Sequence, residues 1–331
     1  MATNGVCLPT TLCVVGHVVS HAIRGSVVTS LVSRNPSFGQ RQRLDAVVVA
    51  GLLFLHVGAV AALFRFSWFA LVLAALLHWL SCSLGVSLAF HRMLSHGSFQ
   101  PVRWLKLVLV GVGCLAMQGR PFYWVGVHRL HHSDPDGEND PHTPRHGLGW
   151  SHVGWMLRQN TGGARRERVV RDLLADPALV WLNRWCPLLQ GLSMVAVYAI
   201  GSAASAIGFH TSGLSCLLWA VGMRVVVAYH ATWLVNSAAH RWGYANYRTR
   251  DDARNLWWVA LITYGEGWHN NHHAHPNSAR IGHRWFEVDA SWWALRIFGF
   301  ARLVRNVKYA SSDRETKEAK LFVRAPAVAE P

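Results

Sequence analysis

The sequence predicts an all-α integral membrane protein with four transmembrane helices. Of its 331 residues, 51% are hydrophobic and only 15% are charged, and the apolar residues gather in four long runs. Each run is long enough to cross roughly 30 Å of hydrocarbon as a helix. Lysines and arginines stand mainly between the runs. Buried helices of a soluble protein are the competing interpretation, but four such runs rarely occur in one soluble core.

The first pair of spans is predicted at residues 46–64 and 67–90. The first run has no charged side chain in 19 positions and the second has none in 24, with Arg65 between them. The second pair is predicted at about residues 186–208 and 212–239. All four runs therefore match the length of helix that a bilayer requires.

Two charged side chains qualify this pattern. Arg224 interrupts the last run, and Lys106 lies in a fifth, shorter apolar stretch at residues 104–118. A stretch of that length is short for a transmembrane helix, so we expect a re-entrant or interfacial helix there.

The distribution of basic residues predicts the orientation of the chain. The turn between the first two spans carries one arginine, and the turn near residues 208–212 carries no lysine or arginine. Residues 91–185 and those after 240 are rich in both, as is the N-terminal arm. By the positive-inside rule, both termini and the central segment face the cytoplasm. Attraction to anionic lipid head groups then explains the net charge of +15 better than binding to nucleic acid.

Three regions are predicted along the chain. Residues 1–44 form a basic cytoplasmic arm, with a transit peptide as the alternative. Residues 45–310 form the membrane domain, whose cytosolic parts are residues 91–185 and 240–310. Residues 311–331 form a flexible charged tail. The six cysteines show no paired spacing, so they predict neither disulfides nor a metal site.

Two histidine motifs have the same spacing. HRLHH at residues 128–132 and HNNHH at residues 269–273 both place histidines at i, i+3 and i+4. On a helix these positions fall within about 100° of one another, so each motif presents three imidazoles on one face. Neutral imidazole is a good ligand for iron, zinc, copper or nickel.

Two further motifs stand at predicted span ends. HRMLSH contains His91 and His96, which are about 140° apart on an α-helix and can share a site only near a helix end or between two metals. NSAAH contains Asn236 and His240, which lie one helical turn apart. The predicted topology places all four motifs at the same membrane face, as one shared site requires.

Nine motif histidines exceed the four ligands of an ordinary zinc site and predict two metals with four or five nitrogens each. The nine are His91, His96, His128, His131, His132, His240, His269, His272 and His273. The other histidines lack this spacing and are interpreted as structural or solvated.

The ordered set HRMLSH, HRLHH, NSAAH and HNNHH resembles the membrane fatty-acyl desaturases of the stearoyl Δ9 type. The phrases DPHTPRHGLGWSHVGWML and ATWLVNSAAHRWG extend the resemblance, which runs from about residue 45 to 300. It implies four transmembrane helices under a cytosolic helical cap, and a di-iron centre (Fe²⁺/Fe³⁺) held by the nine histidines. It also implies that Asn236 reaches one metal through water.

The implied activity is that of an oxidoreductase that uses O₂ to insert a cis double bond, at Δ9, into a saturated acyl chain. Removing hydrogen from an unactivated methylene needs a strong oxidant, which redox-inert zinc cannot generate. Iron that activates O₂ can supply one in a shielded cavity. A featureless chain must be held at a fixed depth, which predicts a narrow apolar tunnel bent at the metals.

Side chains around the centre are expected in two roles. Asp140 and Glu266 are candidates to hold the second nitrogens of ligand histidines, with surface salt bridges as the alternative. The resemblance puts Gln118, Trp124, Thr232 and Trp233 near the bend of the tunnel, although an aromatic side chain taken alone is more often part of core or interface packing.

Electrons must come from a separate carrier, because the chain has no GxGxxG, no CxxCH and no fused carrier domain. A small donor such as cytochrome b5 or ferredoxin, with its reductase, is expected to dock on the basic cytosolic face. Animal acyl-CoA desaturases usually have Arg-Asp before the second histidine motif, where this chain has Gly126 and Val127. This departure favours bacterial or plant-type relatives and leaves acyl-CoA, acyl-lipid or another carrier open.

Three other functions compete. A membrane di-iron hydroxylase or ketolase acting on a lipid or hydrocarbon would use the same histidines. A polytopic metal transporter would place ionisable groups inside its spans, whereas the motifs stand outside them. A membrane zinc protease needs HExxH or its inverse, which the sequence lacks. The expected location is a bacterial inner membrane, or an ER or plastid membrane.

Overall fold

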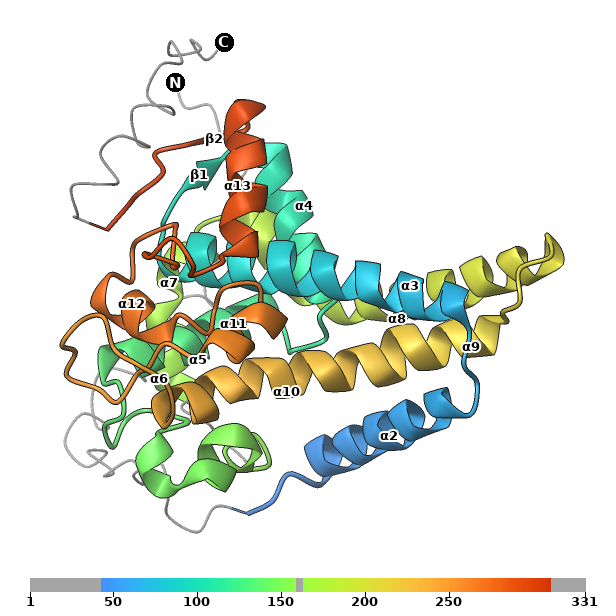
Figure 1. Cartoon of the computed structure of the whole chain (residues 1–331), viewed down its shortest axis with the longest axis horizontal. Helices are drawn as coiled ribbons and strands as arrows, with labels where there is room; N and C mark the ends of the chain where they lie inside the picture. Colours follow the sequence, from blue (N-terminus) through green and yellow to red (C-terminus); the bar gives the residue numbers. More distant parts are fainter. Residues whose placement is uncertain (1–42, 159–162, 311–331) are drawn as a thin grey trace, which may run out of the picture. The chain divides into compact units, whose positions relative to one another are not determined.

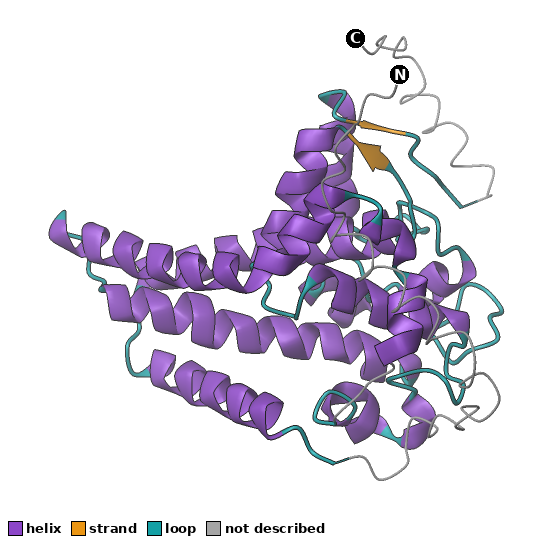
Figure 2. Cartoon of the chain, turned by 180° about the vertical axis from the view of Figure 1, so that it is seen from behind, coloured by secondary structure: helices purple, strands orange, loops and turns teal. Residues whose placement is uncertain are grey.

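The computed structural model describes residues 43–158 and 163–310. The predicted arm 1–44, apart from its last two residues, and the predicted tail 311–331 lie outside this part. The described residues are mostly helical, and helices with connecting loops make up nearly all of the structure in Figure 2. Their one sheet pairs β1 (Gln100–Pro101) with β2 (Val304–Arg305) in antiparallel register.

Four continuous helices are long and apolar enough to span a membrane, which confirms the predicted all-α membrane fold. They are α2 (Ala46–Leu63), α3 (Trp68–His78) continued by the π-helix η1 (Trp79–Ser95), α8 (Pro177–Ala206), and α9 (Gly213–Leu217) continued by η4 (Leu218–Met223), α10 (Arg224–Ser237) and η5 (Ala238–His240).

A side-chain cap starts each of these four helices. Asp45, Ser67, Asp176 and Ser212 each accept a hydrogen bond from a backbone N–H of the first helical turn. Such caps satisfy donors that no helical carbonyl can reach. Asp176, followed by Pro177, starts α8 nine residues before the predicted span, because the cap and the proline set the beginning of the helix.

Small residues bring the long helices close together. A Cβ on Gly85 of η1 would lie 2.5 Å from the Cα of Gly113, and one on Gly222 would lie 2.8 Å from the carbonyl carbon of Gly58. Glycines at such crossings are typical of helices that pack within lipid, where backbones approach closely.

Gly113 belongs to α4 (Arg103–Cys114), the helix expected to be re-entrant or interfacial. Its 12 residues span about 18 Å, too short to cross the hydrocarbon.

Shorter helices gather at one end of the long ones, where η1 and α10 end (Figure 1). They include α5 (Pro121–Ser133), η2 (Pro144–His146), η3 (Trp150–Gly154), α6 (Gly163–Val169), α7 (Arg171–Leu174), α11 (Trp257–Ile262), α12 (His269–Ala274) and α13 (Ala290–Phe300). This helical cap, built from both predicted extramembrane segments, carries most of the motif histidines.

Candidate metal centre

The nine motif histidines converge in two adjacent groups. The five-histidine group consists of His91, His96, His128, His132 and His272. The four-histidine group consists of His131, His240, His269 and His273. Within each group the potential ligand nitrogens all lie within 4.8 Å of one another. The structure thus brings together every predicted histidine ligand and divides them as five and four.

Helices α5 and α12 each contribute to both groups. Helix α5 gives His128 and His132 to the five-histidine group and His131 to the other. Helix α12 has the opposite arrangement. His269 and His273, at i and i+4, belong to the four-histidine group, and His272, at i+3, belongs to the five-histidine group. The division follows helix geometry, because i and i+4 are about 40° apart whereas i+3 lies about 60° to the other side of i.

The π-helix η1 explains how His91 and His96 reach the same group. The backbone N–H of His96 donates to the carbonyl of His91 at 3.2 Å, an i→i+5 bond. A π-turn places residues five apart nearly above one another, as an α-turn does for residues four apart. The two imidazole centroids are therefore 5.0 Å apart, despite the wide separation expected on an α-helix.

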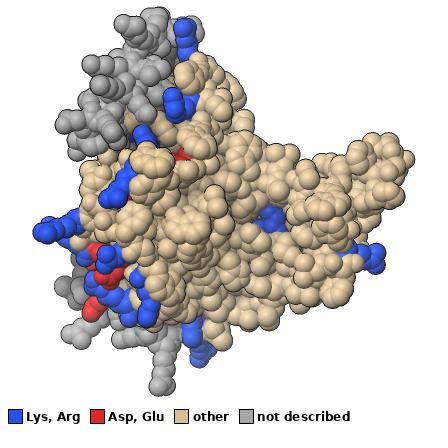
Figure 3. Space-filling view, in the orientation of Figure 1, with Lys and Arg blue, Asp and Glu red and all other residues tan. Residues whose placement is uncertain are grey.

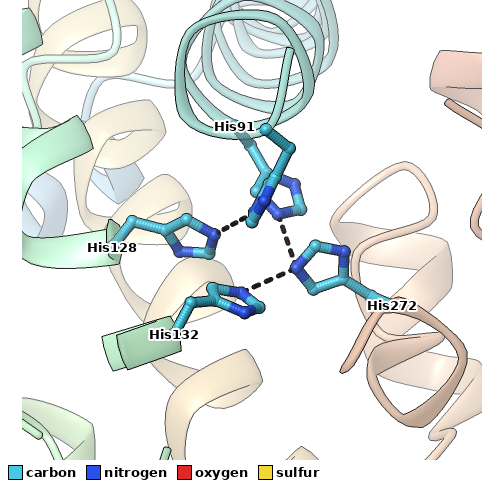
Figure 4. A group of neighbouring side chains, drawn as sticks. His91, His128, His132 and His272 are labelled. Carbon is cyan, nitrogen blue, oxygen red and sulfur yellow. Dashed lines mark hydrogen bonds between the residues drawn. The ribbon is translucent and has the colours of Figure 1, made fainter. Parts of the chain in front are cut away.

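The imidazole nitrogens are spaced as ligands of a shared ion. In the five-histidine group the Nε2–Nε2 distances are 3.0 Å for His91–His272, 2.8 Å for His96–His128 and 2.9 Å for His132–His272. In the other group they are 3.1 Å for His131–His273 and 2.9 Å for His240–His269. Figure 4 shows four of the rings pointing toward one another.

These distances agree with a metal of high coordination number. With metal–nitrogen bonds of about 2.1 Å, neighbouring ligands are about 3.0 Å apart at right angles and about 3.4 Å apart in a tetrahedron. The observed 2.8–3.1 Å fits the first arrangement. Both groups of buried histidines are thus compatible with a metal site.

Burial favours the neutral, metal-binding form of several of these imidazoles. Burial, together with neighbouring imidazoles, lowers the pKa of His128, His132 and His272 well below the ordinary value. The pKa of His273 falls to about 4, mainly through burial. Metal binding requires the neutral ring, so no proton must be removed from these ligands at neutral pH.

The two predicted carboxylate partners both contact a motif histidine. Asp140 Oδ2 lies 2.7 Å from His131 Nδ1, and Glu266 Oε2 lies 2.6 Å from His91 Nδ1. Burial raises the pKa of Asp140, but His131 and His142 outweigh burial and hold it below its usual range. Asp140 is 0% exposed, so the alternative of a surface salt bridge is wrong for it.

Two further carboxylates contact motif histidines and were not predicted from the sequence. Asp136 Oδ1 lies 3.0 Å from His240 Nδ1, and Asp251 Oδ2 lies 2.8 Å from His273 Nδ1. Asp136 stands in the acidic loop after HRLHH, which was a usable signal. Asp251 lies between the third and fourth motifs with no distinctive spacing. Only the fold brings it to its histidine.

Arg92 anchors Glu266 from behind. Its guanidinium, 1% exposed, donates to Glu266 Oε1 at 3.0 Å and to both oxygens of Asp289 at 2.9 Å. The hydroxyl of Ser87 also donates to Glu266. Burial raises the pKa of Glu266, but His91 and Arg92 lower it to about 2, so the carboxylate stays ionised.

An apolar cavity passes beside both groups. It extends from His78 and Cys82 along η1 and α10 to the motif histidines. A second cavity, lined by Tyr229 and Trp155 among others, shares Trp124, His128, Thr232 and Asn236 with the first. The two cavities therefore adjoin each other beside the motif histidines.

All four expected tunnel residues line these cavities. Trp124 and Thr232 line both, and Gln118 and Trp233 line the second. Gln118 Nε2 donates to Thr232 Oγ1 at 2.8 Å, and Trp124 Nε1 donates to Gln118 Oε1 at 3.1 Å. These bonds link α5 to α10 at the junction of the cavities, where they fix the shape of the wall.

Comparison with known proteins agrees with this arrangement. A family model described as fatty acid desaturase matches residues 66–299, well over half of the chain. The chain belongs to the fatty acid desaturase family. The match covers all four histidine motifs and the cavities beside them, so the metal-compatible groups lie within the family's domain.

Several curated members of this family are similar over most of their length. An sn-1 stearoyl-lipid 9-desaturase of Anabaena variabilis is 42% identical over 78% of this chain and 92% of that protein. An sn-2 palmitoyl-lipid 9-desaturase of Nostoc sp. is 38% identical over 82% and 93%. A chloroplastic palmitoyl-monogalactosyldiacylglycerol delta-7 desaturase of Arabidopsis thaliana is 38% identical over 83% and 72%.

Proposed function

We propose that this chain is an O₂-dependent acyl-lipid desaturase that inserts a cis double bond, at Δ9, at a di-iron centre. The observation that carries the proposal is the pair of histidine groups beside two adjoining apolar cavities. Membership of the fatty acid desaturase family supports the reaction.

The nine histidines would hold two irons, with Asn236 reaching the one at the four-histidine group through water. When bound, the irons supply the O₂-derived oxidant that an unactivated methylene requires. Asp140 and Glu266 would fix the orientation of His131 and His91 through their Nδ1 atoms. Asn236 lines both cavities, which places its amide at the same wall as the histidines.

The cavity walls hold the acyl chain and exclude water. Alkyl segments bind no polar group, so the position of the double bond depends on how deeply the chain enters. The Gln118–Thr232 hydrogen bond keeps the bend rigid. Trp124 and Trp233 provide the flat apolar surface against which a chain can turn.

The names of the relatives support an acyl-lipid carrier, since three of them are named for stearoyl-lipid, palmitoyl-lipid or a galactolipid. Gly126 and Val127 before the second motif agree with this choice. An acyl-lipid substrate would then enter the cavity from the bilayer. The four apolar helices would lie in that bilayer.

An external carrier such as ferredoxin or cytochrome b5 would deliver the electrons at the cytoplasmic side, where both termini would also lie. The segment between α10 and α11 exposes Arg241, Arg248, Arg250 and Arg254. Basic side chains show over the cap in Figure 3, while the visible faces of the long helices carry few. This surface suits an acidic carrier, whose association would weaken with salt.

Expression in a host that lacks its own desaturase tests the proposal. We expect fatty-acid methyl esters from its lipids to contain a cis-9 monoene, two mass units below the saturated parent. A product sixteen units heavier would instead establish the rival hydroxylase. Reconstitution with ferredoxin or cytochrome b5 and a reductase identifies the donor, and turnover without any reductant would contradict the electron requirement.

A further inference from the structure

Carboxylates are distributed unequally between the two histidine groups. In the five-histidine group the ion pairs of the described residues include one carboxylate, Glu266, which contacts His91. In the four-histidine group three aspartates contact three of the four histidines. The contacts are Asp140–His131 at 2.7 Å, Asp136–His240 at 3.0 Å and Asp251–His273 at 2.8 Å.

Arg92 does not change this inequality. It pairs with Glu266 at 3.0 Å and with Asp289 at 2.9 Å, so the carboxylate of Asp289 balances its positive charge. The ion pairs of Asp136, Asp140 and Asp251 among the described residues join them to histidines. Backbone N–H groups also donate to these aspartates and leave their charge in place.

The buried position of these acids makes their charge effective. Asp136 is 1% and Asp140 0% exposed, so water screens them little. A carboxylate that accepts the Nδ1–H of a ligand histidine makes the opposite nitrogen a stronger donor to a cation. Losing one such partner typically costs 10–100-fold in metal affinity.

We infer that the two metal positions are inequivalent, and that the four-histidine position binds a cation more tightly and fills first. This rests on the proposed di-metal centre. The five-histidine position has one imidazole ligand more, which by itself would raise its affinity for a cation. Two additional effective carboxylates outweigh it, since together they correspond to roughly 10²–10⁴-fold in affinity. Protein with insufficient metal should therefore hold one ion per chain, in the four-histidine group.

Titration of the metal-free full-length protein in detergent with Co²⁺ tests the inference. Absorption bands and bound metal per chain are followed together. We expect two steps separated by at least about tenfold in affinity. His269→Ala, which disrupts only the four-histidine group, should remove the tighter step. His96→Ala, which disrupts only the other group, should remove the weaker one.

Carboxylate variants test the physical cause. Asp251→Asn should weaken the tighter step by about 10–100-fold and leave the weaker one unchanged, whereas Glu266→Gln should weaken only the weaker step. Asp136→Asn repeats the first test at a second histidine, should Asp251→Asn prevent folding. Glu138→Gln is the matched control, because Glu138 is exposed in the same loop as Asp136 and Asp140. It should change neither step.

Two equal steps in the wild type would overturn the inference, as would a tighter step that survives His269→Ala and disappears in His96→Ala. The titration requires no substrate or reductant, so it is independent of the reaction. Ordered loading without a desaturated product would refute the proposed function alone. A desaturated product together with equal loading would refute the inference alone.

Discussion

Replacing Asn271 by alanine tests how the last histidine motif is held in place. Asn271 is 0% exposed, and its side chain uses every hydrogen-bonding position of the amide. Its Nδ2 donates to Ile281 O at 2.9 Å and to Glu287 Oε2 at 2.7 Å. Its Oδ1 accepts from the amides of Asn246 and Asn255, both at 2.8 Å. The side chain thus binds α12, which carries three imidazoles, to the segment between α10 and α11 and to the segment between α12 and α13.

The magnitude follows from these four bonds. Three neutral bonds are worth about 1 kcal/mol each, and the bond to the Glu287 carboxylate about 1.5–3 kcal/mol. Alanine also leaves buried partners unsatisfied, whereas neighbouring bonds are not additive, so we expect a loss of about 4 kcal/mol. For a chain of 331 residues, with an unfolding entropy of about 2.1 cal/mol/K per residue, the melting temperature should fall by about 6 °C.

The assay is thermal unfolding in detergent together with the metal content of the purified protein. Asn271→Ala should lower the melting temperature and lose metal, because His269, His272 and His273 are no longer held in place. Asn139→Ala is the control, since Asn139 is exposed in the loop after α5. An Asn271→Ala protein that melts at the temperature of the wild type and keeps its metal would show that these four hydrogen bonds do not hold the last histidine motif in place.

Three further predictions concern the reaction, the tunnel and pH. His272→Ala removes a nitrogen that lies within 3.0 Å of two neighbouring imidazoles. The unsaturated product should therefore vanish from the host's lipids while the protein stays in the membrane fraction. Normal product levels would show that His272 is not part of the site. Thr232→Val keeps the volume of the side chain at the bend but loses the hydrogen bond to Gln118. We therefore expect mass spectrometry to find double bonds at several positions of the acyl chain. A single unchanged isomer would show that this hydrogen bond does not fix the position of the chain. Burial lowers the pKa of His283 from 6.5 to about 4, so between these values the unfolded chain binds a proton that the folded chain does not, and stability falls as the solution is acidified. His283→Gln should reduce the fall of the melting temperature between pH 6.5 and 4, because the chain then has one histidine fewer that takes up a proton on unfolding, and equal slopes in both proteins would show that His283 does not contribute.

The four spans, apart from the early start of α8, and the set of nine motif histidines could be predicted from local sequence patterns. Span length is a local property, because a charge-free run of about 20 residues meets the needs of the bilayer wherever the rest of the chain lies. Histidines at i, i+3 and i+4 are likewise a local pattern that fixes one helix face. These features survive in any packing of the helices, which is why they were predictable.

The division of the histidines into two groups, and the side chains that hold them, depend on how distant segments pack together. The five-to-four division depends on how α5 and α12 face each other and on the π-turn that aligns His91 with His96. The partners Asp136 and Asp251, and the Arg92–Asp289 pair, join segments that are far apart in the chain. No local periodicity encodes such contacts, because they arise when separate helices bury their polar groups together and must satisfy them there.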